Sequence, residues 1–342
     1  MKTKPYTMPA EWEQQKAVQL TWPHGATDWQ YMLSEIDATY VDMAYAITLR
    51  EHLIIVTPEP KRVAALLKTK LSDEQMAKTM LVECDTNDTW ARDHGFITLC
   101  SDHGCQLLDF QFNGWGKKFE VSKDNAINRH LYDKGVVKGE YVSHLDFVLE
   151  GGAIESDGQG TVFTTTSCLM APNRNQPMSQ SEIDQRLRES LSAQRIIWLD
   201  HGHLIGDDTD GHIDTLVRVA PNDTLLYVAC DDTNDEQYAD LRLMEEQLNT
   251  LLTTEGKPYR LIKLPMPKAI FDGEERLPAT YANFLVINGA VLYPTYAQPH
   301  LDEEARQAIS KAFPDREMVG IDCRSIIRQH GSLHCCTMQL YR

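Results

Sequence analysis

The feature that most constrains this chain is a helix-then-strand pattern that recurs about every sixty residues. Short apolar strands rich in Val, Ile, Leu and Tyr each follow a helical stretch, and their starts are separated by roughly 54 to 64 residues. The helical stretches lie near 60–79, 124–134, 181–193, 237–252 and 301–313, and the strands begin near Leu81, Tyr141, Arg195, Tyr259 and Met318. Such a regular period predicts repeated supersecondary units rather than one doubly wound sheet.

The stretches around these repeats indicate how the units are built. A long first helix over Asp28 to Arg50 leads into a strand at 53–58, and hairpin-like pairs of strands follow at 153–166, 212–230 and 281–296. A closed, propeller-like α/β ring fits this pattern better than a Rossmann fold, and an irregular α/β domain is the alternative. No linker rich in Pro, Gly or Ser divides the chain, so residues 1–342 are predicted to form a single domain.

The composition limits the partners of the chain. A formal net charge of −17 argues against a nucleic-acid backbone and is compatible with a small cationic ligand. No stretch approaches a membrane span, and the N-terminal residues lack the apolar run of a signal peptide, so we expect a cytoplasmic protein without a membrane partner. The eight cysteines form neither a disulfide framework nor a CxxC metal motif, and we expect reduced thiols.

Four polar clusters follow the repeat at similar positions. They are NDTWARDHG at 87–95, LEGGAI at 149–154, TDGHIDT at 209–215 and GSLHCCT at 331–337. Loops at equivalent positions in a pseudosymmetric ring converge on one axis, so these side chains should meet. A set of acidic and glycine-rich loops with one histidine and one cysteine suits a thiol hydrolase that acts on a cation.

The side chains of these clusters have roles that their chemistry suggests. If 212–214 is extended, His212 and Asp214 project on the same face and combine acid–base chemistry with cation binding. Trp90 and Asp93 suit a planar guanidinium, through stacking on the ring and a two-pronged hydrogen bond. Glu150, followed by two glycines, could accept a proton from His212 and hold its tautomer. The competing interpretations are a satisfied surface histidine, a core tryptophan and a solvated glutamate at a strand end.

Cys335 and Cys336 are the candidates for the nucleophile. If they alternate across a strand, only one of them faces the cleft and the other packs away from it. A buried cysteine without function is the competing interpretation for either one.

With these clusters assembled, the chain resembles the agmatine deiminase and bacterial peptidylarginine deiminase family. The resemblance covers nearly the whole chain. Its motifs are MPAEWE (8–13), TWPH (21–24), DTWARDHG (88–95), FNGWG (112–116), LEGGAIESDGQG (149–160), CLMAPNRN (168–175), DGHID (210–214), NGAVLYPTY (288–296) and SLHCCTMQ (332–339). The family fold implied is a pentein, a five-bladed pseudosymmetric α/β propeller of ββαβ units around an acidic pocket.

The resemblance also implies roles for single residues. Cys335, directly after a histidine, is the nucleophile, and His212 is the general acid and base. Asp93 and Asp214 hold the guanidinium, while Glu150 orients His212. Trp90 resembles the family's pocket-wall tryptophan, and Trp115 is a possible substrate contact. The substrate-binding residues that the resemblance implies are therefore Trp90, Asp93, Trp115 and Asp214. No metal or organic cofactor is needed, and a homodimer is expected.

The expected reaction is hydrolysis of agmatine to N-carbamoylputrescine and ammonia through a covalent Cys-amidino intermediate, a step of putrescine biosynthesis. The alternatives are a peptidylarginine deiminase that makes citrulline, a non-catalytic propeller that binds a partner, and an amidinotransferase. A zinc hydrolase is disfavoured because the His and Cys spacings lack a ligand set. Two departures from the family pattern are the single glycine in RQHGSLHC (328–335) and Cys336, where the family has a branched aliphatic residue.

Overall fold

The computed structural model describes residues 5–341, and most of its strands fall into five sheets with one common order of pairing. In each of these sheets an antiparallel pair is followed by a strand that runs parallel to the second one. The sheets are β18–β1–β2–β3 (Thr337–Tyr341, Gln15–Thr21, His52–Thr57, Thr79–Glu83), β4–β5–β6 (Ile97–Ser101, Gly104–Gln111, Glu140–Val148), β7–β8–β9 (Ile154–Ser156, Thr161–Thr165, Arg195–Leu199), β10–β11–β12 (Val217–Ala220, Thr224–Val228, Arg260–Leu264) and β15–β16–β17 (Leu285–Ile287, Ala290–Thr295, Glu317–Asp322). The small hairpin β13–β14 (Phe271–Asp272, Glu275–Arg276) stands apart from them.

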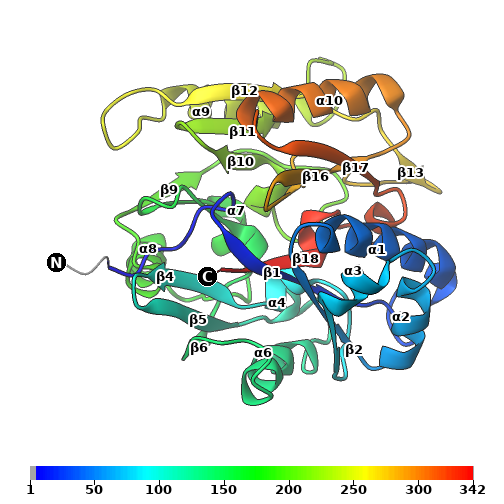
Figure 1. Ribbon diagram of the computed structural model, residues 1–342. Coiled ribbons are helices and arrows are strands. Elements are labelled where there is room, and N and C mark those ends of the chain that lie inside the picture. The colour runs from blue at the N-terminus through cyan, green and yellow to red at the C-terminus, as the bar shows by residue number, and fades with distance from the viewer. Residues whose placement is uncertain (1–4, 342) are drawn as a thin grey trace.

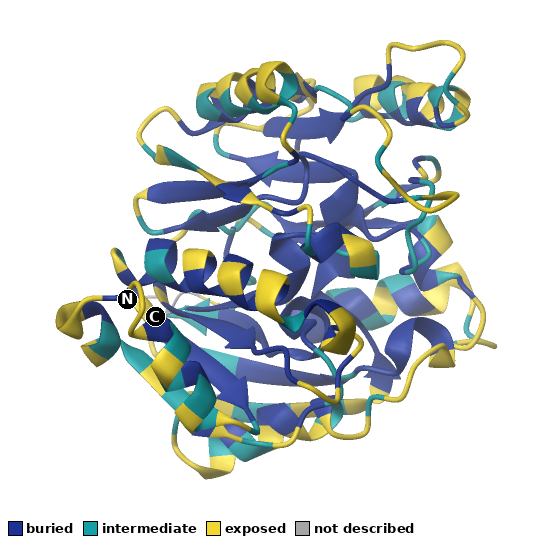
Figure 2. Ribbon diagram, turned by 90° about the vertical axis from the view of Figure 1, so that its right-hand side faces the viewer, coloured by how far each residue is buried: buried dark blue, intermediate teal, exposed yellow. Residues whose placement is uncertain are grey.

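A helix crosses over between the second strand of each sheet and its parallel neighbour, because parallel strands cannot be joined by a tight turn. These helices are α1 (Leu33–Thr48), α6 (Asp124–Asp133), α8 (Gln180–Leu191), α9 (Tyr238–Thr250) and α10 (Pro299–Ala312). In the first sheet, α2 (Pro60–Leu67) and α3 (Asp73–Ala77) also connect β2 to β3. Figure 2 shows dark blue, buried strands inside and helices whose outer turns are exposed. The protein is therefore a mixed α/β fold made of repeated units.

The strands predicted after each helix are confirmed. The predicted starts near Leu81, Tyr141, Arg195, Tyr259 and Met318 correspond to strands that begin at Thr79, Glu140, Arg195, Arg260 and Glu317. The three predicted hairpins are also present, as β7–β8, β10–β11 and β15–β16. The first helix is shorter than expected: a 3₁₀ turn at Gln30–Met32 precedes α1, which ends at Thr48.

Turn chemistry explains why the hairpins form where they do. Asn222 and Asp223, between β10 and β11, both have positive φ, at 60° and 53°. Asn and Asp adopt this left-handed conformation more readily than other residues with a side chain, which favours tight hairpin turns.

Two local predictions are wrong. Cys100 and Cys105 are joined by a disulfide across the β4–β5 hairpin, whereas all cysteines were expected to be reduced thiols. The two residues are directly opposite each other in the ladder, which their spacing in sequence does not reveal. In addition, Cys335 and Cys336 do not alternate across a strand, because they lie in the 3₁₀ turn η5 (His334–Cys336) just before β18.

The first and the last strand of the chain pair with each other in the first sheet. Strand β18 pairs antiparallel with β1, from Leu20 opposite Thr337 to Gln15 opposite Tyr341, and Figure 1 shows the red and blue strands together in the middle of the molecule. Leu340 of β18 is 5% exposed and packs in an apolar cluster with residues of β1, β2 and β5. Among the described residues no helix is long and apolar enough to cross a membrane.

We predict that Leu340→Ala lowers the free energy of unfolding by about 2–5 kcal/mol, because it leaves a cavity where β18 packs. Urea unfolding followed by circular dichroism measures the change. The matched control is Leu243→Ala, which removes a leucine that is 44% exposed on α9 and should change stability by less than about 0.5 kcal/mol. Equal losses for both variants would contradict this account of β18.

Candidate active site

A cavity of about 190 Å³ is lined by the segments before β4, β10 and β18 and by residues that follow β1 and β5. Aromatic and acidic side chains dominate its wall. The lining residues that matter for the argument below are Asp88, Trp90, Asp93, Trp115, Asp208 and Cys335. Each predicted polar cluster runs directly up to the first strand of a sheet: 87–95 to β4, 149–154 to β7, 209–215 to β10 and 331–337 to β18. The repeat therefore brings together four segments that are far apart in the sequence.

Cys335 faces this cavity, while Cys336 is fully buried and does not line it. The Sγ of Cys335 lies 3.4 Å from Oδ1 of Asn283 and 3.9 Å from Oδ2 of Asp214. Burial, together with the negative charges of Asp214 and Asp93, raises the pKa of the Cys335 thiol well above its usual value. A thiolate at this position needs a nearby positive charge.

His212, Asp93 and Asp214 converge over Gly152. A Cβ on Gly152 would lie 2.5 Å from Nδ1 of His212, 2.9 Å from Oδ1 of Asp93 and 3.2 Å from Oδ2 of Asp214. The prediction of an extended 212–214 segment is wrong, because His212 precedes the 3₁₀ turn η3 (Ile213–Thr215). The expected proximity of the two side chains nevertheless holds, since both reach the space above Gly152.

The three titratable groups around Gly152 influence one another. Burial alone would lower the pKa of His212, but the negative charge of Asp93, 3.6 Å from Nδ1, raises it to about 10 together with Cys168 and Glu150. Burial also raises the pKa of Asp93 to about 6, against the effect of His212. The pKa of Asp214 is lowered because His334 and His212 outweigh its burial. At neutral pH the site therefore holds two carboxylates and an imidazolium.

Two tryptophans form the aromatic wall of the cavity. The indole N–H of Trp115 donates to Oδ2 of Asp93 at 3.0 Å, and that of Trp90 donates to Oδ2 of Asp88 at 2.9 Å. The two rings meet edge to face with their centroids 6.2 Å apart. Trp115 has a positive φ of 53°, a conformation that non-glycine residues adopt mainly where the surroundings enforce it. Both predicted tryptophans thus lie at the site, each fixed to a carboxylate.

Glu150 is fully buried beside His212 but forms its hydrogen bond with Arg174, whose Nε lies 3.0 Å from Oε1. Glu150, His212 and Cys168 each place a ligand atom within 4.8 Å of the others. No hydrogen bond joins Glu150 to His212 among the described residues. The role of orienting His212 therefore stays a prediction, now supported by proximity alone.

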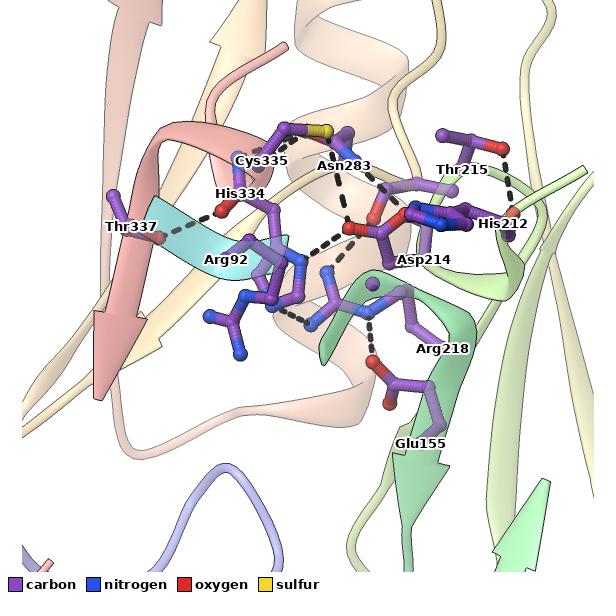
Figure 3. A network of polar contacts seen from close by, with 12 residues as sticks. Arg92, Glu155, His212, Asp214, Thr215, Arg218, Asn283, His334, Cys335 and Thr337 are labelled. Carbon is purple, nitrogen blue, oxygen red and sulfur yellow. Dashed lines mark hydrogen bonds and ion pairs between the residues drawn. The ribbon is translucent and has the colours of Figure 1, made fainter. Parts of the chain in front are cut away.

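A buried network beneath the site escaped the sequence analysis, and Figure 3 shows part of it. His334 lies between Asp214, 2.7 Å from its Nδ1, and Glu11, 2.8 Å from its Nε2. Arg218 donates to Glu11 at 2.6 Å and to Glu155 at 2.7 Å, and it contacts the backbone carbonyls next to Asn283. This network anchors Asp214 and the segment that carries Asn283.

Asn283 is the residue that the sequence pattern could have revealed. It precedes β15, at the same place in its unit as the four predicted clusters in theirs. Its Oδ1 accepts hydrogen bonds from the backbone N–H groups of His334, at 2.9 Å, and Cys335, at 3.3 Å. Asn283 therefore fixes the turn that carries the cavity cysteine.

Metal-binding side chains gather at two places in the described part of the chain, although their spacing in sequence indicates no ligand set. One group is Glu150, Cys168 and His212, and the other is Glu11, Glu155 and His334. Each group draws residues from different units, which is why spacing could not reveal it.

Comparisons with known proteins agree on one family. Residues 7–340 match a family model described as Porphyromonas-type peptidyl-arginine deiminase. A relative from Marinomonas sp. (strain MWYL1), named "Putative agmatine deiminase", is 32% identical over 98% of this chain and 94% of its own. The solved structure of a "Putative Arginine Deiminase" from Porphyromonas gingivalis is 51% identical over 99% of both chains, with a TM-score of 0.93. An agmatine deiminase variant from C. jejuni with substrate bound is 35% identical over 100% and 98% of the two chains, with a TM-score of 0.91.

We predict that Gly152→Ala destabilises the protein by about 1–3 kcal/mol, because the added methyl group displaces the buried side chains of His212 and Asp93. Gly25→Ala is the control, since no atom lies within 4 Å of its new Cβ. Denaturant unfolding of both variants measures the difference. A Gly152→Ala protein as stable as the wild type would mean that the site has more room than described.

Proposed function

The chain belongs to the Porphyromonas-type peptidyl-arginine deiminase family, and from that premise we propose that it hydrolyses agmatine to N-carbamoylputrescine and ammonia. Its membership and its relatives make it an enzyme, a hydrolase acting on amidino C–N bonds. Three observations together carry the proposal: Cys335 and Asp93 line one cavity, Asp214 lies 3.9 Å from the Cys335 sulfur, and His212 meets Asp93 and Asp214 at Gly152. A non-catalytic binding module would have no need for this combination.

The carboxylates of Asp93 and Asp214 are the proposed clamp for the guanidinium. Both side chains are almost fully buried, and Oδ1 of Asp214 has no hydrogen-bond partner among the described residues. A buried carboxylate oxygen without a donor is unfavourable, and the N–H groups of a guanidinium would supply one. The rings of Trp90 and Trp115 provide flat apolar faces for the same planar cation.

Binding of the cation would also activate the nucleophile. The pKa of Cys335 is high because of burial and the charges of Asp214 and Asp93, and a guanidinium between these carboxylates offsets that charge. The Cys335 thiolate then adds to the central carbon of the guanidinium. His212, whose pKa of about 10 keeps it protonated, donates the proton with which ammonia leaves. The C–N bond breaks, and an amidino-thioether on Cys335 remains.

The second half of the reaction reverses the role of the histidine. His212, now neutral, takes a proton from a water molecule that attacks the amidino carbon. The hydroxyl of the adduct then passes its proton to the sulfur as the C–S bond breaks and the ureido product leaves, so Cys335 is a thiol again. His212 keeps the proton that it took from water and is again an imidazolium, and the released ammonia takes up the proton that the thiol lost at the start. The side chain of Asn283, 3.4 Å from Sγ, would hold Cys335 in the same position through both steps.

The remote end of the substrate is recognised by charge in this proposal. Asp28, Asp88 and Asp208 line the cavity, whose described lining includes no arginine or lysine. Burial, with Asp28 nearby, raises the pKa of Asp88 to about 7, so an adjacent ammonium would be favoured there. Agmatine ends in an ammonium, whereas arginine ends in a carboxylate that these residues would repel.

Free arginine as the substrate would call for a basic residue that faces its carboxylate, but Arg92 and Arg174, from the DTWARDHG and CLMAPNRN motifs, do not line the cavity. Arg92 donates to Gln339 and Met338, and Arg174 is held by Glu150, Asp210 and the backbone of Thr209. Both guanidinium groups are therefore engaged elsewhere, which favours agmatine over free arginine. A peptidylarginine deiminase is the second candidate, because the family model and a solved structure of 41% identity carry the name peptidyl-arginine deiminase.

The finer features of the family are part of the same proposal. We infer that the five sheets are the blades of a closed propeller of ββαβ units, with the β18–β1 pair completing the first blade. A homodimer, a role in putrescine biosynthesis and a cytoplasmic location also belong here. The disulfide between Cys100 and Cys105 is unusual for a reducing compartment, and it makes the location worth testing by cell fractionation.

The test of function is turnover of agmatine, arginine and a blocked arginyl peptide, each supplied alone to chelator-treated protein. We expect ammonia and the ureido product from agmatine only, because its ammonium suits the acidic cavity. Turnover of the peptide instead would keep the mechanism and replace the substrate. Absence of product from all three would favour the binding module, and a requirement for an acceptor amine would favour an amidinotransferase.

The neighbouring cysteines offer a matched pair for testing the mechanism. We predict that Cys335→Ala abolishes turnover, by at least about 10³-fold, because no other thiol faces the cavity among the described residues. Cys336→Ala should retain most of the activity, because Cys336 packs towards Tyr40 and away from the cavity. Rates of ammonia release at saturating substrate compare the two variants. The reverse pattern would identify Cys336 as the nucleophile.

A further inference from the structure

The imidazole of His212 is fully buried, and neither of its ring nitrogens has a hydrogen-bond partner among the described residues. Buried polar groups are normally satisfied, and an unsatisfied one costs about 1–3 kcal/mol. Beside this ring lie the thiol of Cys168 and the carboxylate of Glu150, each with a ligand atom within 4.8 Å of the others. Cys168 has no part in the proposed hydrolysis.

We propose that Glu150, Cys168 and His212 form a binding site for Zn²⁺, and that the bound ion inhibits the enzyme; the inhibition rests on the proposed function. A carboxylate oxygen, a thiolate sulfur and an imidazole nitrogen are the donors that zinc prefers. Three protein ligands leave a fourth position for water. Zinc bonds of about 2.0–2.3 Å require the three donors to approach by side-chain shifts on the order of 1 Å.

The second group of metal-binding side chains provides the contrast. Glu11, Glu155 and His334 satisfy the same distance criterion, but Arg218 already donates to both carboxylates. Both nitrogens of His334 have partners as well. In the His212 group Arg174 likewise donates to Glu150, but neither ring nitrogen of His212 has a hydrogen-bond partner among the described residues, and this is the difference between the two groups.

The surroundings of the proposed site favour a dication. Asp93, 3.6 Å from Nδ1 of His212, adds negative charge beside the three ligands. The Nε of Arg174 lies 3.0 Å and 3.4 Å from the two carboxylate oxygens of Glu150, and Arg174 is itself fixed by Asp210 and by the backbone of Thr209. Such outer contacts orient the ligands of metal sites and strengthen binding.

The cavity gives the ion a route to the ligands. Asp93 and Thr209 line the cavity, and both contact His212: Thr209 accepts the backbone N–H of His212 at 3.0 Å, while Asp93 faces the ring. Of these two residues only Asp93 faces the imidazole, whose Nδ1 lies 3.6 Å from its Oδ1, so an ion would reach the ring past the side chain of Asp93.

Zinc at this position would block the reaction for two reasons. A metal bond occupies the lone pair with which His212 exchanges protons. The positive ion also lies next to Asp93, where it opposes binding of the guanidinium. The metal and the substrate would therefore exclude each other.

Cobalt titration of the Cys335→Ala protein tests the site without the nucleophile. We expect one equivalent of Co²⁺ to bind and to produce thiolate-to-cobalt charge-transfer absorption. Cys168→Ser in the same background should remove this band, and Glu150→Gln should weaken binding by at least about 10-fold. Cys230→Ser is the matched control, because it removes another buried thiol that lies in the unit of β10 and β11 and should leave the band unchanged.

The outcomes separate the metal site from the proposed function. The proposal is overturned if the charge-transfer band persists in the folded Cys168→Ser protein, or if the Cys335→Ala protein shows no band. If Cys168→Ser does not fold, the proposal is overturned when Glu150→Gln leaves the midpoint of the Co²⁺ titration unchanged. With active enzyme, Zn²⁺ should lower the rate of the wild type but leave the rate of Cys168→Ser, whatever its level, unchanged. Equal inhibition of both would assign the effect to Cys335. If no guanidine is hydrolysed, the proposed function fails while the cobalt titration still decides the metal site.

Discussion

A single buried guanidinium holds the centre of this protein together. Arg218 is 1% exposed, and it is neutralised by Glu11 and Glu155, which come from the segment before β1 and from β7. The same side chain binds backbone carbonyls just before β15 and touches His334 just before β18. Removing one partner of a buried ion pair typically costs about 3–5 kcal/mol, because the other charge is left without compensation. Four of the five units therefore depend on one side chain.

The site above this network carries negative charge, opposite in sign to the guanidinium of Arg218, that its neighbours do not fully compensate. Asp93 and Asp214 are buried together, and only the imidazolium of His212 and the His334 network compensate them. A positively charged ligand completes this arrangement, and the same deficit explains why the thiol of Cys335 resists ionisation when the cavity has no cation. Affinity for the ligand and reactivity of the nucleophile thus have a common electrostatic origin.

The positions of the strands and of several site residues could be predicted because the structural unit that carries them is repeated along the chain. The sixty-residue period located the strands that follow each helix, and it placed Asp93, His212 and Cys335 in equivalent loops. Asp93 and Cys335 line one cavity, and His212 lies 3.6 Å from Asp93. The period alone could not identify Arg218, whose partners come from other units, or the disulfide at Cys100, which depends on strand register. Nor could it distinguish 3₁₀ turns from extended segments, because three residues are too few to show a periodicity.

The pairing of β18 with β1 links the presence of the Cys335 thiol to the order in which the chain is translated. Cys335 follows the other residues of the site in the chain, so the proposed nucleophile is the last of them to be synthesised. Until β18 has been made, β1 has an unpaired edge, which is the kind of strand that recruits other chains into aggregates. Translation that stops before β18 would leave this edge unpaired and would omit the proposed nucleophile, so the truncated product would be both inert and prone to aggregate.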